Sequence, residues 1–195
     1  LGTHNFATGY LALTNITSSA VRGNTAIGRY ALYDNESGGW NTAIGSESSS
    51  NLISGNENIT IGRFSGRYLK SGNNNIMLGT SAGASDELGN DNEDSNNSIY
   101  IGSDTKTLAD GQSNEIVIGY NNVGKGSNTV VLGNNSITQT YLKGKVNVDG
   151  AYVLPETTGQ PGDVLKVPAA GGGNELVWST PAAAYTLPAA TSTSI

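Results

Sequence analysis

A short apolar run that ends in glycine recurs along most of this 195-residue chain, and its spacing limits the possible folds more than any other feature. The pentapeptide Asn-Thr-Ala-Ile-Gly occurs twice without change, beginning at Asn24 and at Asn41. Variants of it end at eight glycines: Gly9, Gly28, Gly45, Gly62, Gly79, Gly102, Gly119 and Gly133. These positions differ by 19, 17, 17, 17, 23, 17 and 14 residues. Self-similarity at a nearly fixed period is typical of a repeat protein whose stacked units share one core.

The length of the unit indicates which kind of repeat this is. Helical solenoids need about 33 to 47 residues per unit, and the units here are about half as long. Glycine and asparagine punctuate every unit, which disfavours helices. We therefore predict an all-β fold, a parallel β-solenoid in which each coil holds two short strands and two turns. Each strand would stack about 4.8 Å above its predecessor.

Alternation within the repeated strand assigns its residues to two faces. We predict that the residues one and three positions before each glycine fill the coil interior; they are Thr8, Ile27, Ile44, Ile61, Leu78, Ile101, Ile118 and Leu132, and Phe6, Thr25, Thr42, Ile59, Ile76, Ile99, Ile116 and Val130. The residues two positions before form the opposite face: Ala7, Ala26, Ala43, Thr60, Met77, Tyr100, Val117 and Val131. Both faces are mostly apolar, as in strands that are buried on both sides.

The second apolar face needs a cover that so short a coil does not supply. We expect another copy of the chain to cover it, in a homo-oligomer of closed cyclic symmetry. The alternative is an exposed stripe of small residues, which suits the coils that carry Ala26 and Ala43. Met77, Tyr100 and Val117 favour assembly, because large exposed apolar patches are uncommon.

Small residues recur at the third position after each glycine, where a narrow coil needs its two walls to approach closely. They are Ala12, Ala31, Ser48, Ser65, Ala82, Thr105, Asn122 and Ser136.

Composition and charge exclude several classes of function. The formal net charge of −6 disfavours general electrostatic binding to nucleic acid or to an anionic membrane. No apolar run is long enough to span a bilayer, so we expect no membrane insertion. Cysteine is absent, which excludes disulfides and thiolate metal sites.

No catalytic, cofactor-binding or metal-binding residues are predicted. The stretch Gly119–Ser127 has the glycine and lysine spacing of a phosphate loop, but Gly126 stands where Ser or Thr must hold magnesium. His4 has no second histidine or cysteine for a metal site.

An acidic segment, 84–95, lies in the longest repeat and contains Asp86, Glu87, Asp91, Glu93 and Asp94. We interpret it as a solvated acidic turn. Two alternatives stay open: a calcium site formed by carboxylate oxygens, and a carboxylate pair for glycoside hydrolysis.

Candidate receptor-binding side chains are the aromatic and arginine residues that flank the strands, since both kinds are enriched in interfaces. They could equally be structural edges of the coil. They are Tyr10, Arg29, Tyr30, Trp40, Arg63, Phe64, Arg67 and Tyr68.

The series NTAIGRYA, NTAIGSES, NITIGRFSG, NEIVIGYN and NTVVLGNNS resembles the YadA-like head repeats of trimeric autotransporter adhesins, over about residues 5–137. The resemblance implies a left-handed parallel β-roll in which three chains wind into a tight, intertwined homotrimer. It places a β-roll domain at residues 1–142.

The remainder is similar to a segment that follows such rolls in bacteriophage tail and capsid fibres. The residues that carry this similarity are Leu142, Lys143, Gly144, Val146, Leu154, Pro155, Gly159, Gly162, Asp163, Val164, Leu165, Leu176 and Trp178. We expect a short-stranded, extended connector at residues 143–195. Its closing stretch, Ala184–Ile195, is similar to the start of a further fibre module, and we expect the chain to be part of a longer one.

Together the two resemblances imply a non-enzymatic structural protein on a phage virion, in a tail fibre or in a capsid or vertex fibre, that takes part in host-surface attachment. The partners would be its own copies, other tail or capsid proteins, and a host surface glycan or protein. The main alternative is the head of a bacterial adhesin at the cell surface. A glycan-degrading tailspike is the third hypothesis.

Overall fold

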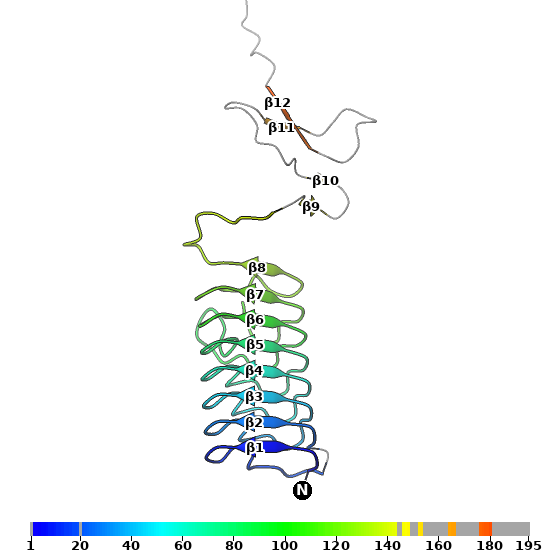
Figure 1. Ribbon diagram of the computed structural model, residues 1–195, viewed down its shortest axis with the longest axis vertical. Coiled ribbons are helices and arrows are strands. Elements are labelled where there is room, and N and C mark those ends of the chain that lie inside the picture. Colours follow the sequence, from blue (N-terminus) through cyan, green and yellow to red (C-terminus); the bar gives the residue numbers. More distant parts are fainter. Residues whose placement is uncertain are drawn as a thin grey trace, which may run out of the picture. The chain divides into compact units, whose positions relative to one another are not determined.

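The computed structural model describes residues 2–19, 21–143, 146–148, 152–153, 164–166 and 176–180. The chain divides into two compact units, Leu1–Thr138 and Gln139–Ile195. The first unit is a parallel β-solenoid, so the predicted all-β repeat fold is confirmed (Figure 1). Its eight strands pair in chain order: β1 (Phe6–Thr8), β2 (Thr25–Ile27), β3 (Thr42–Ile44), β4 (Ile59–Ile61), β5 (Ile76–Leu78), β6 (Ile99–Ile101), β7 (Ile116–Ile118) and β8 (Val130–Leu132).

We call the segment that begins with a given strand and runs to the next strand a coil, and number the coils after their strands. Equivalent residues of successive coils stack in register, for example Ala26 on Ala43 and Thr60 on Met77. The long coil five keeps this register, since Leu78 still pairs with Ile101. Its extra residues form an excursion closed by an antiparallel bridge between Ser85 and Asp91. Insertions are therefore accommodated in the turns and leave the sheet intact.

Each coil contains one strand of the sheet, so the prediction of two strands per coil is wrong. The other walls are turns and isolated β-bridges, joined from coil to coil by backbone hydrogen bonds such as Ser49 N–H to Ser65 C=O at 2.9 Å. The reason lies in the backbone. In coil four, φ is positive at Gly62 (133°), Phe64 (63°) and Gly66 (56°), and such alternating left-handed residues interrupt an extended chain.

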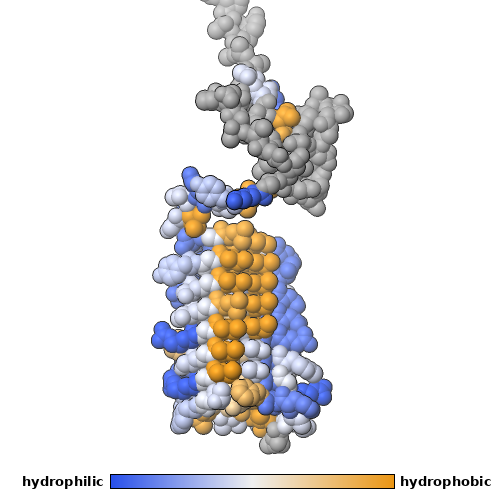
Figure 2. Space-filling model, viewed as in Figure 1, coloured by the Kyte–Doolittle hydropathy of each residue, from blue (hydrophilic) through white to orange (hydrophobic). Residues whose placement is uncertain are grey.

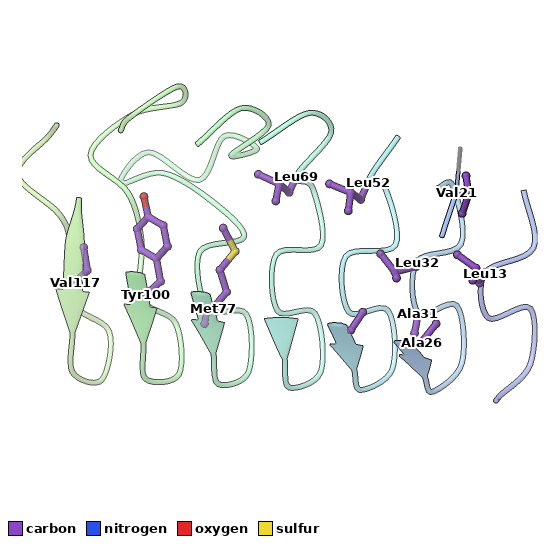
Figure 3. Close-up of a cluster of buried hydrophobic side chains, with 12 residues drawn as sticks. Leu13, Val21, Ala26, Ala31, Leu32, Leu52, Leu69, Met77, Tyr100 and Val117 are labelled. Carbon is purple, nitrogen blue, oxygen red and sulfur yellow. The ribbon is translucent and has the colours of Figure 1, made fainter. Parts of the chain in front are cut away.

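The core lies inside the coils, and the predicted assignment of strand faces is wrong. The middle residue of the strand points inward, and Met77, Tyr100 and Val117 are fully buried in one continuous cluster (Figure 3). Leu52 and Leu69 enter the same interior from the wall opposite the strands. The residues one and three positions before the glycine point outward. Alternation separates two faces of a strand, but it does not say on which side the coil closes.

Side-chain sizes across the coil explain why the middle residue can be inside. Gly83 lies so close to Met77 and Tyr100 that a Cβ there would stand 2.8 Å from the Met77 sulfur and 2.9 Å from the Tyr100 ring. Where the strand instead offers Ala26, the same wall of its coil supplies Leu32. Large and small residues thus alternate across a narrow interior, which keeps it filled.

The small residues at the third position after the glycine close the core as predicted. Five of them, from coils two to six, are completely buried: Ala31, Ser48, Ser65, Ala82 and Thr105. Ser65 shows why space is limited there, since its Oγ donates to the Met77 carbonyl at 2.7 Å in the next strand. A larger side chain would push these walls apart.

A ladder of buried asparagines runs beside the strands. Asn58 is representative: its Oδ1 accepts from the Asn75 backbone N–H, and its Nδ2 donates to Asn41 Oδ1, both at 3.0 Å. The same amide nitrogen donates to the Gly72 carbonyl at 2.8 Å. Each amide therefore satisfies groups in neighbouring coils and in the turn beside it, which explains why asparagine precedes so many of the repeated strands.

The second unit contains two short antiparallel pairs: β9 (Asn147–Val148) with β10 (Tyr152–Val153), and β11 (Val164–Lys166) with β12 (Val177–Ser179). Most residues of the predicted connector lie outside the described ranges. Within those ranges there is no helix with the length and apolar character needed to cross a membrane.

Candidate functional site

The exposed face of the sheet is an apolar stripe two residues wide. It consists of the outward strand residues of coils two to eight: Thr25, Ile27, Thr42, Ile44, Ile59, Ile61, Ile76, Leu78, Ile99, Ile101, Ile116, Ile118, Val130 and Leu132. Figure 2 shows it as a continuous hydrophobic band along the strands. Ile59 and Ile61, in the middle of the stack, are each 40% exposed. Because the register stacks β-branched side chains in columns, the stripe is flat, continuous and unpartnered within the described chain.

Seven of the eight predicted receptor-binding side chains gather into one aromatic and arginine cluster beside coils one to four. Tyr10 and Tyr30 pack edge to face at 5.6 Å between ring centroids, and the guanidinium of Arg29 lies 4.8 Å from the Tyr30 centroid. Three further cation–π pairs belong to the cluster: Arg63 and Arg67 over Phe64, each at 4.8 Å, and Arg67 over Tyr68 at 5.2 Å. The cluster is therefore a surface of fixed rings and charges.

Glu47 connects the two halves of the cluster. One carboxylate oxygen pairs with Arg29 and the other with Arg67, the latter at 3.0 Å. The Nε–H of Arg67 is buried and has no hydrogen-bond acceptor within the described part of the chain. Glu47 was not singled out in the sequence, because its partners lie 18 residues before it and 20 residues after it.

A groove of about 290 Å³ opens beside this cluster. Three successive coils line it, with Tyr30, Tyr33, Asp34, Glu47, Ser50, Asn51 and Arg67. Tyr33 packs perpendicular to Tyr30 at 5.2 Å between centroids. The sequence predicted Tyr30 and Arg67 but missed the other lining residues. The only signal for them was their equivalent position after the strand glycine in stacked coils.

Trp40 is the predicted residue that lies apart from the cluster. It is exposed and stacks under Arg22, whose guanidinium carbon lies 4.9 Å from the ring centroid. Its ring also covers Gly23, where a Cβ would stand 2.7 Å from the indole Cδ1. Trp40 therefore acts as an edge of the coil, which was the structural alternative raised for this group.

Backbone geometry explains how Tyr30 and Phe64 project from the coil. Both occupy the second position after the strand glycine, where φ is 57° at Tyr30 and 63° at Phe64. Asn121 holds the same position in coil seven, and asparagine tolerates this conformation best among residues other than glycine. For an aromatic residue the left-handed conformation costs about 1–2 kcal/mol. Ring packing and any bound ligand must offset this cost.

Three of the five carboxylates in the acidic segment 84–95 have partners within the protein. Glu93 pairs with Lys70 at 2.6 Å, and Asp94 accepts a hydrogen bond from Ser71. Asp86 Oδ1 accepts from the backbone N–H of Leu88 at 2.9 Å and of Asn90 at 2.8 Å, which shapes the tip of the excursion. Across the described ranges, no three acidic or histidine side chains converge as ligands for a metal ion.

The Asp86 contacts predict a pH dependence of this excursion. The side-chain amide of Asn90 and the backbone N–H groups of Asn90 and Leu88 donate to the carboxylate, which holds the pKa of Asp86 below its usual 3.8. Because the pKa is lowered in the folded state, the ionised Asp86 carboxylate stabilises the excursion at any pH above the ordinary pKa. This stabilisation is lost as the pH falls through the pKa of the folded state. We expect the hydrogen-exchange protection factors of the Leu88 and Asn90 amides to fall when the pH is lowered through the pKa of Asp86 in the folded state. In Asp86→Asn this fall should be absent; an equal fall in both proteins would contradict the assignment.

Glu115, directly before β7 at the end of coil six, occupies the ladder position that asparagine holds elsewhere, and it is completely buried. Its carboxylate accepts from Tyr100 Oη at 3.0 Å, Thr107 Oγ1 at 2.8 Å and the backbone N–H of Gly126 at 2.7 Å. Burial raises the pKa of Tyr100 to about 12, so its hydroxyl stays a donor at physiological pH. Gly126, in the stretch with phosphate-loop spacing, therefore binds a carboxylate of the protein itself, which is the behaviour of a structural turn.

Comparisons of the chain with models of protein families, with curated proteins and with solved structures gave no match.

Proposed function

We propose that this chain is a segment of a homotrimeric, non-enzymatic fibre of a phage virion, in which the β-solenoid gives mechanical extension and takes part in attachment to the host surface. The observation that carries the proposal is the apolar stripe of coils two to eight. A solenoid whose exposed sheet face carries an apolar stripe through seven of its eight coils gains most by burying that face against copies of itself.

The sequence predicted that the middle residues of the strands face the partner chains. In the proposed assembly the outward residues of the stripe face the partners instead. The inward face is filled by the chain itself, so the isoleucine columns are the face left for partners. Identical copies meeting through one lengthwise stripe close into a ring around an axis parallel to the stack. The left-handed roll and the number three come from the resemblance to adhesin heads.

The virion setting is supported by the resemblance of residues 142–178 to the connectors of phage fibres. An antibody against the chain should label phage particles in electron micrographs of infected host cells. Labelling of the surface of uninfected bacteria would instead favour the adhesin head.

The trimer predicts a specific effect of one charge in the stripe. Wild-type protein should sediment at three times the 20.0 kDa chain mass, and Ile61→Asp should sediment as a monomer, because each trimer would bury three carboxylates at the axis. Ile53→Asp is the matched control: Ile53 is 39% exposed, against 40% for Ile61, but lies outside the stripe. Analytical ultracentrifugation distinguishes the two. A monomeric wild type would refute the assembly.

A further inference from the structure

The groove lined by Tyr30, Tyr33, Asp34, Asn51 and Arg67 has the size and chemistry of a binding site for a small polar molecule. Its volume of about 290 Å³ is at the lower end of the range for ligand pockets, roughly 300–1,000 Å³. Such a volume suits one or two sugar rings better than a peptide segment. We propose that this groove binds a neutral saccharide of one or two hexopyranose rings.

The aromatic wall supplies the apolar contact that a pyranose needs. Sugar rings carry one face of C–H groups, which packs against an aromatic ring. Arg29 already covers part of Tyr30, whereas no cation lies over Tyr33 within the described chain. The perpendicular packing of Tyr33 on Tyr30 fixes its orientation, so little side-chain freedom is lost on binding. Tyr33 is therefore the stacking surface.

The polar wall supplies one donor and one acceptor for ring hydroxyls. Asp34 Oδ1 accepts from Asn15 Nδ2 at 2.9 Å, which leaves Oδ2 without a protein partner in the described chain. Asn51 Oδ1 accepts from Ser50 Oγ at 2.9 Å, which orients the amide and leaves its Nδ2 as a donor. A hydroxyl both donates and accepts, so neighbouring hydroxyls of a sugar match this pair.

Charges in the groove favour a neutral ligand over an acidic one. The lining holds two carboxylates, Asp34 and Glu47, and one guanidinium, that of Arg67, which already pairs with Glu47. The Asp34 carboxylate would repel an anion, and the chain as a whole is negative.

This inference rests on the proposed attachment function and narrows its partner to one chemical class. The test uses the purified chain and disaccharides of glucose, galactose, mannose, N-acetylglucosamine and N-acetylgalactosamine, with sialyllactose as the acidic comparison. Isothermal titration should give binding of at least one neutral disaccharide with a Kd of about 1 mM or tighter, at one site per chain. Sialyllactose should bind at least about tenfold more weakly.

Two substitutions assign the site to the groove. Tyr33→Ala and Asn51→Ala should each raise the Kd about tenfold. Trp40→Ala removes an exposed aromatic ring outside the groove and should leave the Kd unchanged. Thermal melts followed by circular dichroism would show whether each variant is folded. If Tyr33→Ala fails to fold, Tyr33→Phe, which keeps the ring, should retain binding, and Asn51→Ala carries the test.

Absence of binding by every neutral disaccharide, or equal loss of binding in Trp40→Ala, would overturn the inference. Stronger binding of sialyllactose would do so as well. Sedimentation of the same samples separates this outcome from a failure of the fibre proposal. A trimer without saccharide binding refutes only the groove, and a saccharide-binding monomer refutes only the assembly.

Discussion

Gly62→Ala should lower the free energy of unfolding of the solenoid by about 3–5 kcal/mol, which would be an exceptional effect for one methyl group. Gly62 has a φ of +133°, a conformation that residues with a side chain rarely adopt. An added Cβ would also stand 2.5 Å from the Gly79 carbonyl oxygen and 3.2 Å from the Thr80 nitrogen of the next coil. Both neighbours are backbone atoms, so the overlap is relieved only by separating coils four and five.

The matched control is Gly111→Ala. Gly111 also has a positive φ, +74°, but an added Cβ would meet nothing within 4 Å. This substitution should therefore cost only the conformational strain, about 1–2 kcal/mol. Urea denaturation followed by circular dichroism measures both. Equal losses in the two variants would mean that contact between stacked glycines contributes nothing, contrary to the stacking account of the repeat.

Asn58→Ala should have the second largest effect, a loss of about 2–4 kcal/mol. It removes the acceptor of the buried Asn75 backbone N–H and the donor that serves the Gly72 carbonyl. Each buried polar group left without a partner costs about 1–3 kcal/mol. Because a solenoid is stabilised mainly by contacts between neighbouring units, the damage is concentrated between coils two, three and four.

Asn73→Ala tests whether burial is the cause. Asn73 belongs to a second asparagine ladder nearer the surface, where its Oδ1 accepts from the Asn56 backbone N–H at 2.9 Å. Asn56 is only half-buried, so water can replace the lost acceptor. The expected loss is below about 1 kcal/mol in the same urea experiment. A loss as large as that of Asn58→Ala would indicate that ladder geometry matters more than desolvation.

The apolar stripe shows how a correct pattern led to a wrong placement. The sequence divided the strand correctly into two apolar faces, and it placed Ile59 and Ile61 on one and Thr60 on the other. We then predicted that the isoleucines lie inside the coil. Alternation does not determine on which side of the strand the coil closes, and the structure encloses the middle residue.

The candidate binding groove shows a different limit. Tyr30 and Arg67 were recognisable as surface groups, but Tyr33, Asp34 and Asn51 carry no local signature. Their meeting depends on the lengths of the intervening turns and on coil stacking, which bring residues 17 apart side by side. Composition and alternation contain no information on such distances.

The repeat alone determined the parallel stack, the position of each strand before its glycine and the small residues that close the coil. The physical reason is that equivalent positions in stacked coils have the same environment. The same residue types are therefore favoured at each of them, and the sequence repeats with the period of the structure. Only the tertiary structure decided which face of the strand is enclosed, that each coil has one strand, and which side chains form the groove. These depend on how the chain closes on itself, where Gly83 makes room for Met77 and Tyr100 and left-handed residues turn the remaining walls.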